Sequence, residues 1–181
     1  MRNSFDRAEC LRSTAAIAIE IRRLTEGLRP GHFHAPTRTG GWSIGYCMEH
    51  LILAGNALLL NWDSASHIAG DGRSFPYSWW QRALLLWVQN PSLMKRRTPP
   101  ALAPYSRHSI EETLQQLLRM HAGLAYRLDS SGTLDLQRTK ITIPTLPAVR
   151  CSLGFACDLS LSHERRHLAQ AWRIRRQIEQ S

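Results

Sequence analysis

The chain has 181 residues, of which 43% are hydrophobic and 20% charged, a composition that fits one globular domain over residues 1–181. Lys and Arg number 23 against 14 Asp and Glu, a net charge of +9, so an anionic partner has to be considered. No apolar run approaches the roughly 20 residues of a membrane-spanning helix, and the first residues lack the apolar core of a secretory signal. We therefore expect a soluble, cytoplasmic protein whose four cysteines, which form no C-x-x-C pair, are free thiols.

The first half of the chain has two helical patterns followed by a long connection. Residues 4–28 carry apolar side chains at spacings of three and four, and the pattern ends before Pro30. A second helix is expected over 43–66, with its first residue, a serine, as the N-cap. Residues 70–104 contain many turn signals and prolines, and only 77–89 has a helical pattern. This segment is expected to be a crossover that contains one short helix.

The second half of the chain contains two more helices. Ser109 and Glu112 form a capping box, in which each side chain accepts a bond from a free backbone amide, so a helix is expected over 109–128. Residues 133–149 alternate weakly and hold two prolines, and we expect an extended loop there; the last helix is expected over 152–179. Four long helices with a crossover between the second and third predict an all-α fold, a four-helix bundle.

Histidines lie on the predicted core faces of two helices. A rotation of 100° per residue puts His163 and His167 in the apolar stripe of the last helix, and His50 in that of the second helix. The arginines of the last helix are expected on its opposite, solvated side: Arg165, Arg166, Arg173 and Arg176. Because buried imidazoles need partners for their ring nitrogens, three of them in one core favour a bound divalent metal ion.

Paired histidines at this spacing have a simpler interpretation, since they often only form hydrogen bonds within a core. His121 also lies on an apolar stripe, and we expect it to be a hydrogen-bonded core histidine and not a fourth ligand. The remaining histidines are expected at the surface, in loops or near helix ends: His32, His34, His67 and His108.

The letters H-E-x-x-H at 163–167 match the zinc-peptidase signature, but the rest of that signature is missing. The extended form continues with a glycine and a third histidine, and neither follows His167 here. The one later carboxylate side chain, Glu179, lies about three turns further along the same helix and cannot reach the ion. Glu164 could polarise a metal-bound water or form an outer salt bridge with Arg165. The sequence argues against a zincin peptidase.

Two segments resemble a known family. The stretch from Trp42 to Leu51, WSIGYCMEHL, resembles the W-S-x(6)-H-L segment of the DinB/YfiT-like superfamily, in its DinB_2 branch. Asp135-Leu136 followed by LSHERRHLAQAWRIRRQ resembles that branch's closing segment, in which H-x-x-x-H precedes L-x-Q. The resemblance covers about residues 14–177. It implies a four-helix bundle, a metal triad of His50, His163 and His167, and a homodimer; family members include thiol-dependent S-transferases and a thiol-dependent isomerase.

The residues and the resemblance leave three hypotheses about function. In the first, three histidines hold zinc, nickel or iron with an open coordination position, where a low-molecular-weight thiol or a water is activated toward a small-molecule substrate.

In the second, the chain is a basic binding module or scaffold with a non-catalytic metal site. Its basic residues would be Arg165, Arg166, Arg173, Arg175, Arg176 and Lys95-Arg96-Arg97. No nucleic-acid recognition motif is present, which argues against a nucleic-acid partner. In the third, the site is vestigial and the bundle is a dimer scaffold.

Overall fold

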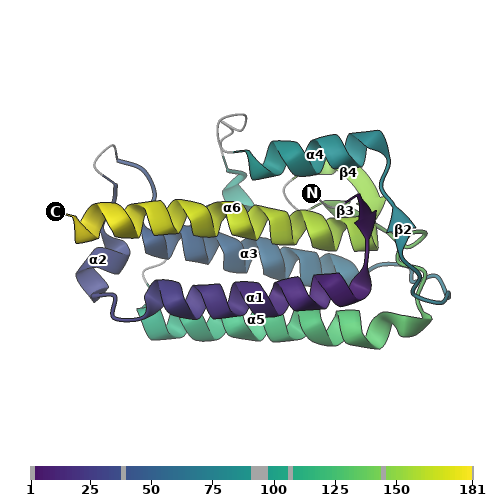
Figure 1. The fold of residues 1–181 in the computed structure, drawn as a ribbon, viewed down its shortest axis with the longest axis horizontal. Coiled ribbons are helices and arrows are strands. Elements are labelled where there is room, and N and C mark those ends of the chain that lie inside the picture. Colours follow the sequence, from purple (N-terminus) through teal and green to yellow (C-terminus); the bar gives the residue numbers. More distant parts are fainter. Residues whose placement is uncertain (1–2, 38–39, 91–97, 106–107, 144–145, 181) are drawn as a thin grey trace.

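The fold is the predicted four-helix bundle. The computed structural model describes residues 3–37, 40–90, 98–105, 108–143 and 146–180. The long helices are α1 (Arg7–Thr25), α3 (Ile44–Asp63), α5 (Ile110–Ser130) and α6 (Leu153–Glu179) (Figure 1). Around the bundle α1 lies beside α5, α5 beside α3, α3 beside α6 and α6 beside α1. Helices α1 and α6 run in one direction and α3 and α5 in the other (Figure 1).

Side-chain caps fix where the helices begin. Asp6 accepts a hydrogen bond from the Glu9 amide at the start of α1, and Ser43 accepts one from the Tyr46 amide at the start of α3. The predicted capping box is present at the start of α5. Helix α1 begins three residues later than predicted because Ser4–Phe5 forms strand β1, which pairs with strand β2 (Phe75–Pro76) in an antiparallel sheet.

Short elements in two segments of the chain correct the sequence-based expectations. The sequence predicted only the end of a helix before Pro30, but α2 (Pro30–His34) forms a separate short helix there. Proline is tolerated in the first turn of a helix because the backbone N–H groups of that turn form no bond within the helix. The segment expected as an extended loop contains the 3₁₀ turn η3 (Ser131–Thr133) and the antiparallel strands β3 (Lys140–Ile143) and β4 (Leu146–Ser152).

The crossover between α3 and α5 packs helix α4 (Trp79–Gln89) onto the outside of α6 (Figure 1). Just before α4, the Tyr77 hydroxyl donates a 2.5 Å hydrogen bond to Asp158 on α6. The Cys10 thiol of α1 donates to the other oxygen of the same carboxylate, at 3.3 Å. All three side chains are buried. One buried carboxylate therefore joins the crossover to both helices.

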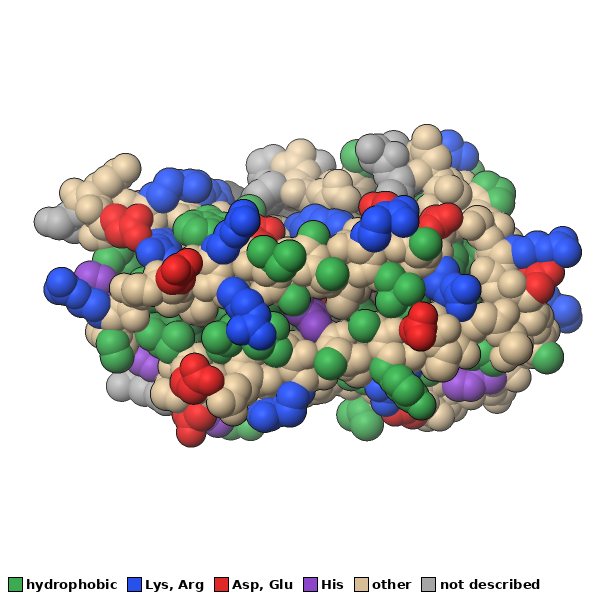
Figure 2. All heavy atoms as spheres, turned by 60° about the horizontal axis from the view of Figure 1, so that its bottom comes forward, with side chains coloured by type: hydrophobic (Ala, Val, Ile, Leu, Met, Phe, Trp, Pro, Cys, Tyr) green, Lys and Arg blue, Asp and Glu red, His purple; other side chains and the backbone are tan. Residues whose placement is uncertain are grey.

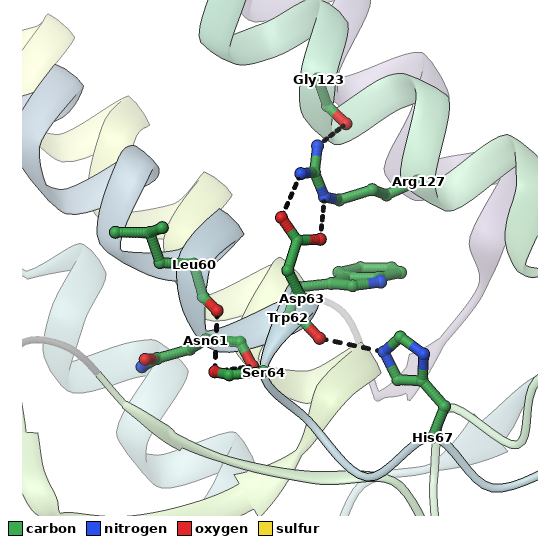
Figure 3. Close-up of polar contacts among 8 residues, drawn as sticks. All are labelled: Leu60, Asn61, Trp62, Asp63, Ser64, His67, Gly123 and Arg127. Atoms are coloured by element: carbon green, nitrogen blue, oxygen red, sulfur yellow. Dashed lines mark hydrogen bonds and ion pairs between the residues drawn. The ribbon is translucent and has the colours of Figure 1, made fainter.

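The carboxyl end of α3 is fastened to α5 and to strand β3, and Figure 3 shows the contact with α5. Arg127 on α5 donates two hydrogen bonds, of 2.8 and 2.5 Å, to the carboxylate of Asp63, and a third of 3.0 Å to the carbonyl of Gly123. Asn61 donates a 2.8 Å bond to the carbonyl of Thr142 on β3. These contacts hold the position of α3 in the bundle, and thereby the direction in which its core face points.

The core is one cluster of apolar side chains that includes all four cysteines. Cys10, Cys47, Cys151 and Cys157 are buried thiols that form no disulfide, as predicted. Burial raises the pKa of Cys47 and of Cys151 to about 12, so both stay protonated at neutral pH. Within the part of the chain that is described, no helix has both the length and the apolar composition needed to cross a membrane.

Candidate metal centre

The three histidines predicted as metal ligands meet inside the bundle. His50 comes from α3 and His163 and His167 from α6, and they are 3%, 9% and 8% exposed. One potential ligand atom from each lies within 4.8 Å of the other two. The ring centroids of the three pairs are 5.0, 4.8 and 4.6 Å apart. The i, i+4 spacing on α6 and the core face of α3 produce this arrangement.

The spacing of the nitrogens suits one metal ion. Nε2 of His50 lies 3.2 Å from Nε2 of His163. Two imidazole nitrogens held ~2.05 Å from one tetrahedral ion lie about 3.3 Å apart. Little movement would therefore be needed for both nitrogens to bind the same ion, and His167 lies near enough to supply a third ligand.

A backbone carbonyl fixes the orientation of His50. Its Nδ1 lies 2.8 Å from the carbonyl oxygen of Leu102, in the 3₁₀ turn η2 (Pro100–Leu102) of the crossover. Because a carbonyl oxygen can only accept, Nδ1 must carry the proton. In the neutral ring the lone pair then belongs to Nε2, the atom that faces His163. Such a bond on the far side of a ligand ring is common in metal sites.

The surroundings of the triad keep its histidines neutral. Burial lowers the pKa of His163 to about 3 and that of His167 to about 2, and it also lowers the pKa of His50. Burial is the largest cause of these two low pKa values, and neighbouring rings of the triad and the positive charge of Arg166 contribute to them. At neutral pH all three rings therefore have a free lone pair, which metal binding requires.

Trp42 forms part of the wall of the site. It directly precedes the N-cap of α3, and its ring centroid lies 5.1 Å from that of His50 and 5.7 Å from that of His167. Its plane is nearly parallel to the ring of His167, at 25°. In the sequence this tryptophan was recognised only as part of a family motif, although an aromatic residue directly before the N-cap of a core-facing helix could have indicated a packing role.

The remaining histidines lie away from the triad. Nε2 of His121 on α5 lies 2.6 Å from a carboxylate oxygen of Glu164, and the two residues are only 3% and 2% exposed. His121 is thus the hydrogen-bonded core histidine that was predicted. Glu164 has neither expected role, because its position on the buried side of α6 directs it to His121 and not to Arg165 or the triad. His67 and His108 are exposed, whereas His32 and His34 are half-buried on α2.

One arginine of α6 is not where it was predicted. The expected solvated face is correct for the exposed Arg165, Arg173 and Arg176. Arg166 is instead half-buried, and its Nη1 atom is fully buried. It lies three residues after His163, which on a helix is only about 60° around the axis, so it borders the apolar stripe. Its charge acts on all three histidines of the triad.

The comparisons with known proteins agree with this arrangement. The family model of the DinB superfamily matches residues 19–171. Among solved structures, the chain is similar to YfiT from Bacillus subtilis, with a TM-score of 0.57 and 14% identity over 96% of this chain and 87% of that one. YfiT is described as a probable metal-dependent hydrolase with an unusual four-helix bundle topology. No curated protein matches the chain. The chain belongs to the DinB superfamily and has a YfiT-like four-helix-bundle fold.

Proposed function

We propose that this protein is a metal-dependent enzyme in which His50, His163 and His167 hold a divalent ion and a low-molecular-weight thiol is activated for transfer to a small electrophile. The observation that carries the proposal is the convergence of three buried imidazoles within 4.8 Å. Their lowered pKa values and the bond from His50 to the Leu102 carbonyl support it. Imidazole ligands suit zinc, nickel and iron.

Three protein ligands leave a coordination position open, as in catalytic zinc sites. An ion held there would lower the pKa of a thiol or water bound to it toward neutrality. In the transfer, the thiol gives its proton to solvent, its sulfur forms a bond to an electrophilic carbon, and the leaving group departs with the electron pair of the broken bond. The histidines contribute neutral donors in fixed positions, and Leu102 and Trp42 hold His50 and His167 in orientation.

Hydrolysis is the second candidate, because the same open position would activate water. The similarity to YfiT, described as a probable metal-dependent hydrolase, favours it. A thiol requirement separates the two reactions: an S-transferase forms a thioether product only when thiol is present, whereas a hydrolase turns over without it. Formation of a homodimer and the identity of the small-molecule substrate stay predictions.

The basic binding module has less support. Arg175 on α6 donates bonds of 3.1 and 2.8 Å to the last carbonyls of α1, at Arg23 and Leu24, and one of 2.6 Å to Glu179. It therefore has a structural role in the bundle. On the face in Figure 2, acidic side chains lie among the basic ones. Lys95-Arg96-Arg97 lies outside the described residues.

Metal analysis of purified protein tests the proposal. We expect about one zinc, nickel or iron ion per chain, and its loss in His50→Ala and in His167→Ala, because two imidazoles hold a divalent ion much more weakly than three. His108→Ala is the matched control, since it removes an exposed histidine. Far-ultraviolet circular dichroism would verify that each variant is folded. Full metal content in both site variants would contradict the proposal.

A further inference from the structure

A pocket of about 390 Å³ lies at the carboxyl end of α3, between that helix, the segment that follows it and the hairpin of β3 and β4. Asn61 on the α3 side donates a 2.8 Å hydrogen bond to the carbonyl of Thr142 on β3, which holds the two walls together. Asn61 lies eleven residues after His50 on α3, about 16 Å further along the helix axis. The pocket is therefore separate from the histidine triad, and its volume is typical of small-molecule sites.

Three basic side chains line this pocket, those of Arg138, Lys140 and Arg150. On the hairpin Arg150 lies opposite Thr142, and Lys140 is two residues before Thr142 on β3. Because side chains alternate across a strand, these three share one face of the hairpin, whereas Ile141 between them is buried in the core. Lys140 and Arg150 are thus diagonal neighbours, and such residues are about 7–8 Å apart.

The positive charges of the pocket are not balanced by carboxylates. Among the described residues, no Asp or Glu lines the pocket and none of its three basic side chains is in an ion pair. Nζ of Lys140 donates a 2.7 Å bond to the carbonyl of Gln137, which is uncharged. Asp63, the last residue of α3, is already bound by Arg127. Because like charges that are neighbours on a sheet repel each other, a bound anion would relieve this repulsion.

The last carbonyls of α3 have hydrogen-bond donors of their own (Figure 3). The Ser64 hydroxyl donates a 2.8 Å bond to the carbonyl of Leu60. Nε2 of His67 lies 2.9 Å from the carbonyl oxygen of Trp62 and must carry the proton, since a carbonyl only accepts. Side chains thereby satisfy carbonyl groups that would otherwise repel an anion at this end of the helix.

We propose that this pocket binds a small phosphate monoester, with the phosphate group held by Arg138, Lys140 and Arg150. A phosphate monoester has three terminal oxygens and up to two negative charges at neutral pH, so it can use more donors than a carboxylate, for which one guanidinium suffices. Two guanidinium groups and one ammonium supply these donors. Ser64 and Ser66 also line the pocket, and their hydroxyls suit a ligand that carries hydroxyl groups. The expected ligand is a sugar phosphate.

Titration of ¹⁵N-labelled protein with ribose 5-phosphate tests the proposal, because amide chemical shifts report where the ligand binds. We expect saturable shifts at the amides of Ser66 and Thr142, which line the pocket. Ribose has the same sugar without the phosphate, and we expect no response to it over the same concentrations. The amide of His50 should not shift, since the triad is remote from the pocket.

A pair of double variants separates binding in the pocket from attraction by net charge. Lys140→Gln combined with Arg150→Gln should weaken ribose 5-phosphate binding about tenfold or more, because two charge-assisted hydrogen bonds are lost. Arg165→Gln combined with Arg176→Gln is the matched control. It lowers the net charge by the same amount, but it alters exposed arginines of α6 that do not line the pocket. We expect the control to bind as tightly as the unchanged protein.

Three results would overturn the proposal. The first is the absence of saturable shifts in the unchanged protein, and the second is an equal response to ribose. The third is equal weakening in the two double variants, which would mean that net charge alone attracts the sugar phosphate. All four substituted side chains are exposed, and the dispersion of the amide spectrum shows directly whether each variant is folded. The metal content of the protein is a separate measurement, so the two proposals can fail independently.

Discussion

One backbone carbonyl decides which nitrogen of His50 is available. The bond from Nδ1 to Leu102 leaves the lone pair on Nε2, where it faces the other two histidines. A ring that could rotate or change tautomer would have to be ordered when the ion binds, at a cost in free energy. The carbonyl belongs to the crossover, so this segment, which is remote from the triad in sequence, takes part in building the site.

The triad also makes the metal-free protein sensitive to acid. Its histidines have lowered pKa values in the folded state, about 3 for His163 and about 2 for His167, against about 6.5 in an unfolded chain. Below pH 6.5 the unfolded state therefore binds more protons than the folded state, and the free energy of unfolding falls as the pH falls. Above pH 6.5 these histidines are mostly deprotonated in both states, so the free energy of unfolding no longer changes with pH on their account.

We accordingly expect the urea midpoint of metal-free protein to decrease steadily from pH 6.5 to pH 4.5. His167→Gln should show a smaller decrease over the same range, because one of the buried groups no longer takes up a proton on unfolding. His67→Gln, which alters an exposed histidine, should follow the unchanged protein. The slope against pH is compared, and not the absolute stability, so that any packing effect of the substitution cancels. Parallel slopes for His167→Gln and the unchanged protein would contradict the lowered pKa of His167 in the folded state.

Periodicity and distance explain which parts of the site the sequence could predict. The core faces of α3 and α6 follow from local spacing, and they place His50, His163 and His167 correctly. Arg166 was wrongly predicted to face solvent. It lies at the border of the apolar stripe, where the charge of an arginine suggests exposure although the side chain is half-buried. The Leu102 carbonyl could not be predicted, since backbone groups carry no sequence signature and the path of the crossover depends on tertiary contacts.

At the scale of elements, the helices with strong local signals were predicted well. The serine caps at residues 43 and 109 mark the starts of α3 and α5 within one residue. The hairpin was missed because its pairing, such as Ile141 opposite Cys151, is not encoded in either strand alone. Helix α2 was missed because five residues give too short a pattern for periodicity.

The contact that attaches the crossover to the bundle can be tested by removing one oxygen atom. Tyr77→Phe deletes the hydroxyl that donates the 2.5 Å bond to Asp158 and leaves a buried carboxylate one hydrogen bond short. We expect the free energy of unfolding to decrease by about 1–3 kcal/mol. Tyr105→Phe, the same change at a residue 81% exposed, should alter it by less than about 0.5 kcal/mol. Urea unfolding measures both, and equal effects would mean that the buried bond contributes nothing.

At the scale of the whole molecule, the triad joins two helices that are neighbours in space but distant in the chain. His50 and His163 are 113 residues apart, and α3 and α6 run in opposite directions with the crossover, α5 and the hairpin between them in sequence (Figure 1). An ion held by both helices would bind the folded state and not the unfolded chain, in which the ligands are separated. Metal binding should therefore be visible as global stabilisation.

Zinc added to metal-free protein should raise Tm. At a free concentration one hundred times Kd, binding contributes about 2.7 kcal/mol, and for a chain of this length each kcal/mol raises Tm by about 2–4 °C. We expect a shift of about 5–10 °C by differential scanning calorimetry. His108→Ala should show the full shift and His167→Ala little of it. A full shift of Tm in His167→Ala would mean that zinc binds elsewhere. The absence of a shift in the unchanged protein would mean that no ion joins α3 and α6, because an ion bound by ligands from both helices must stabilise the bundle.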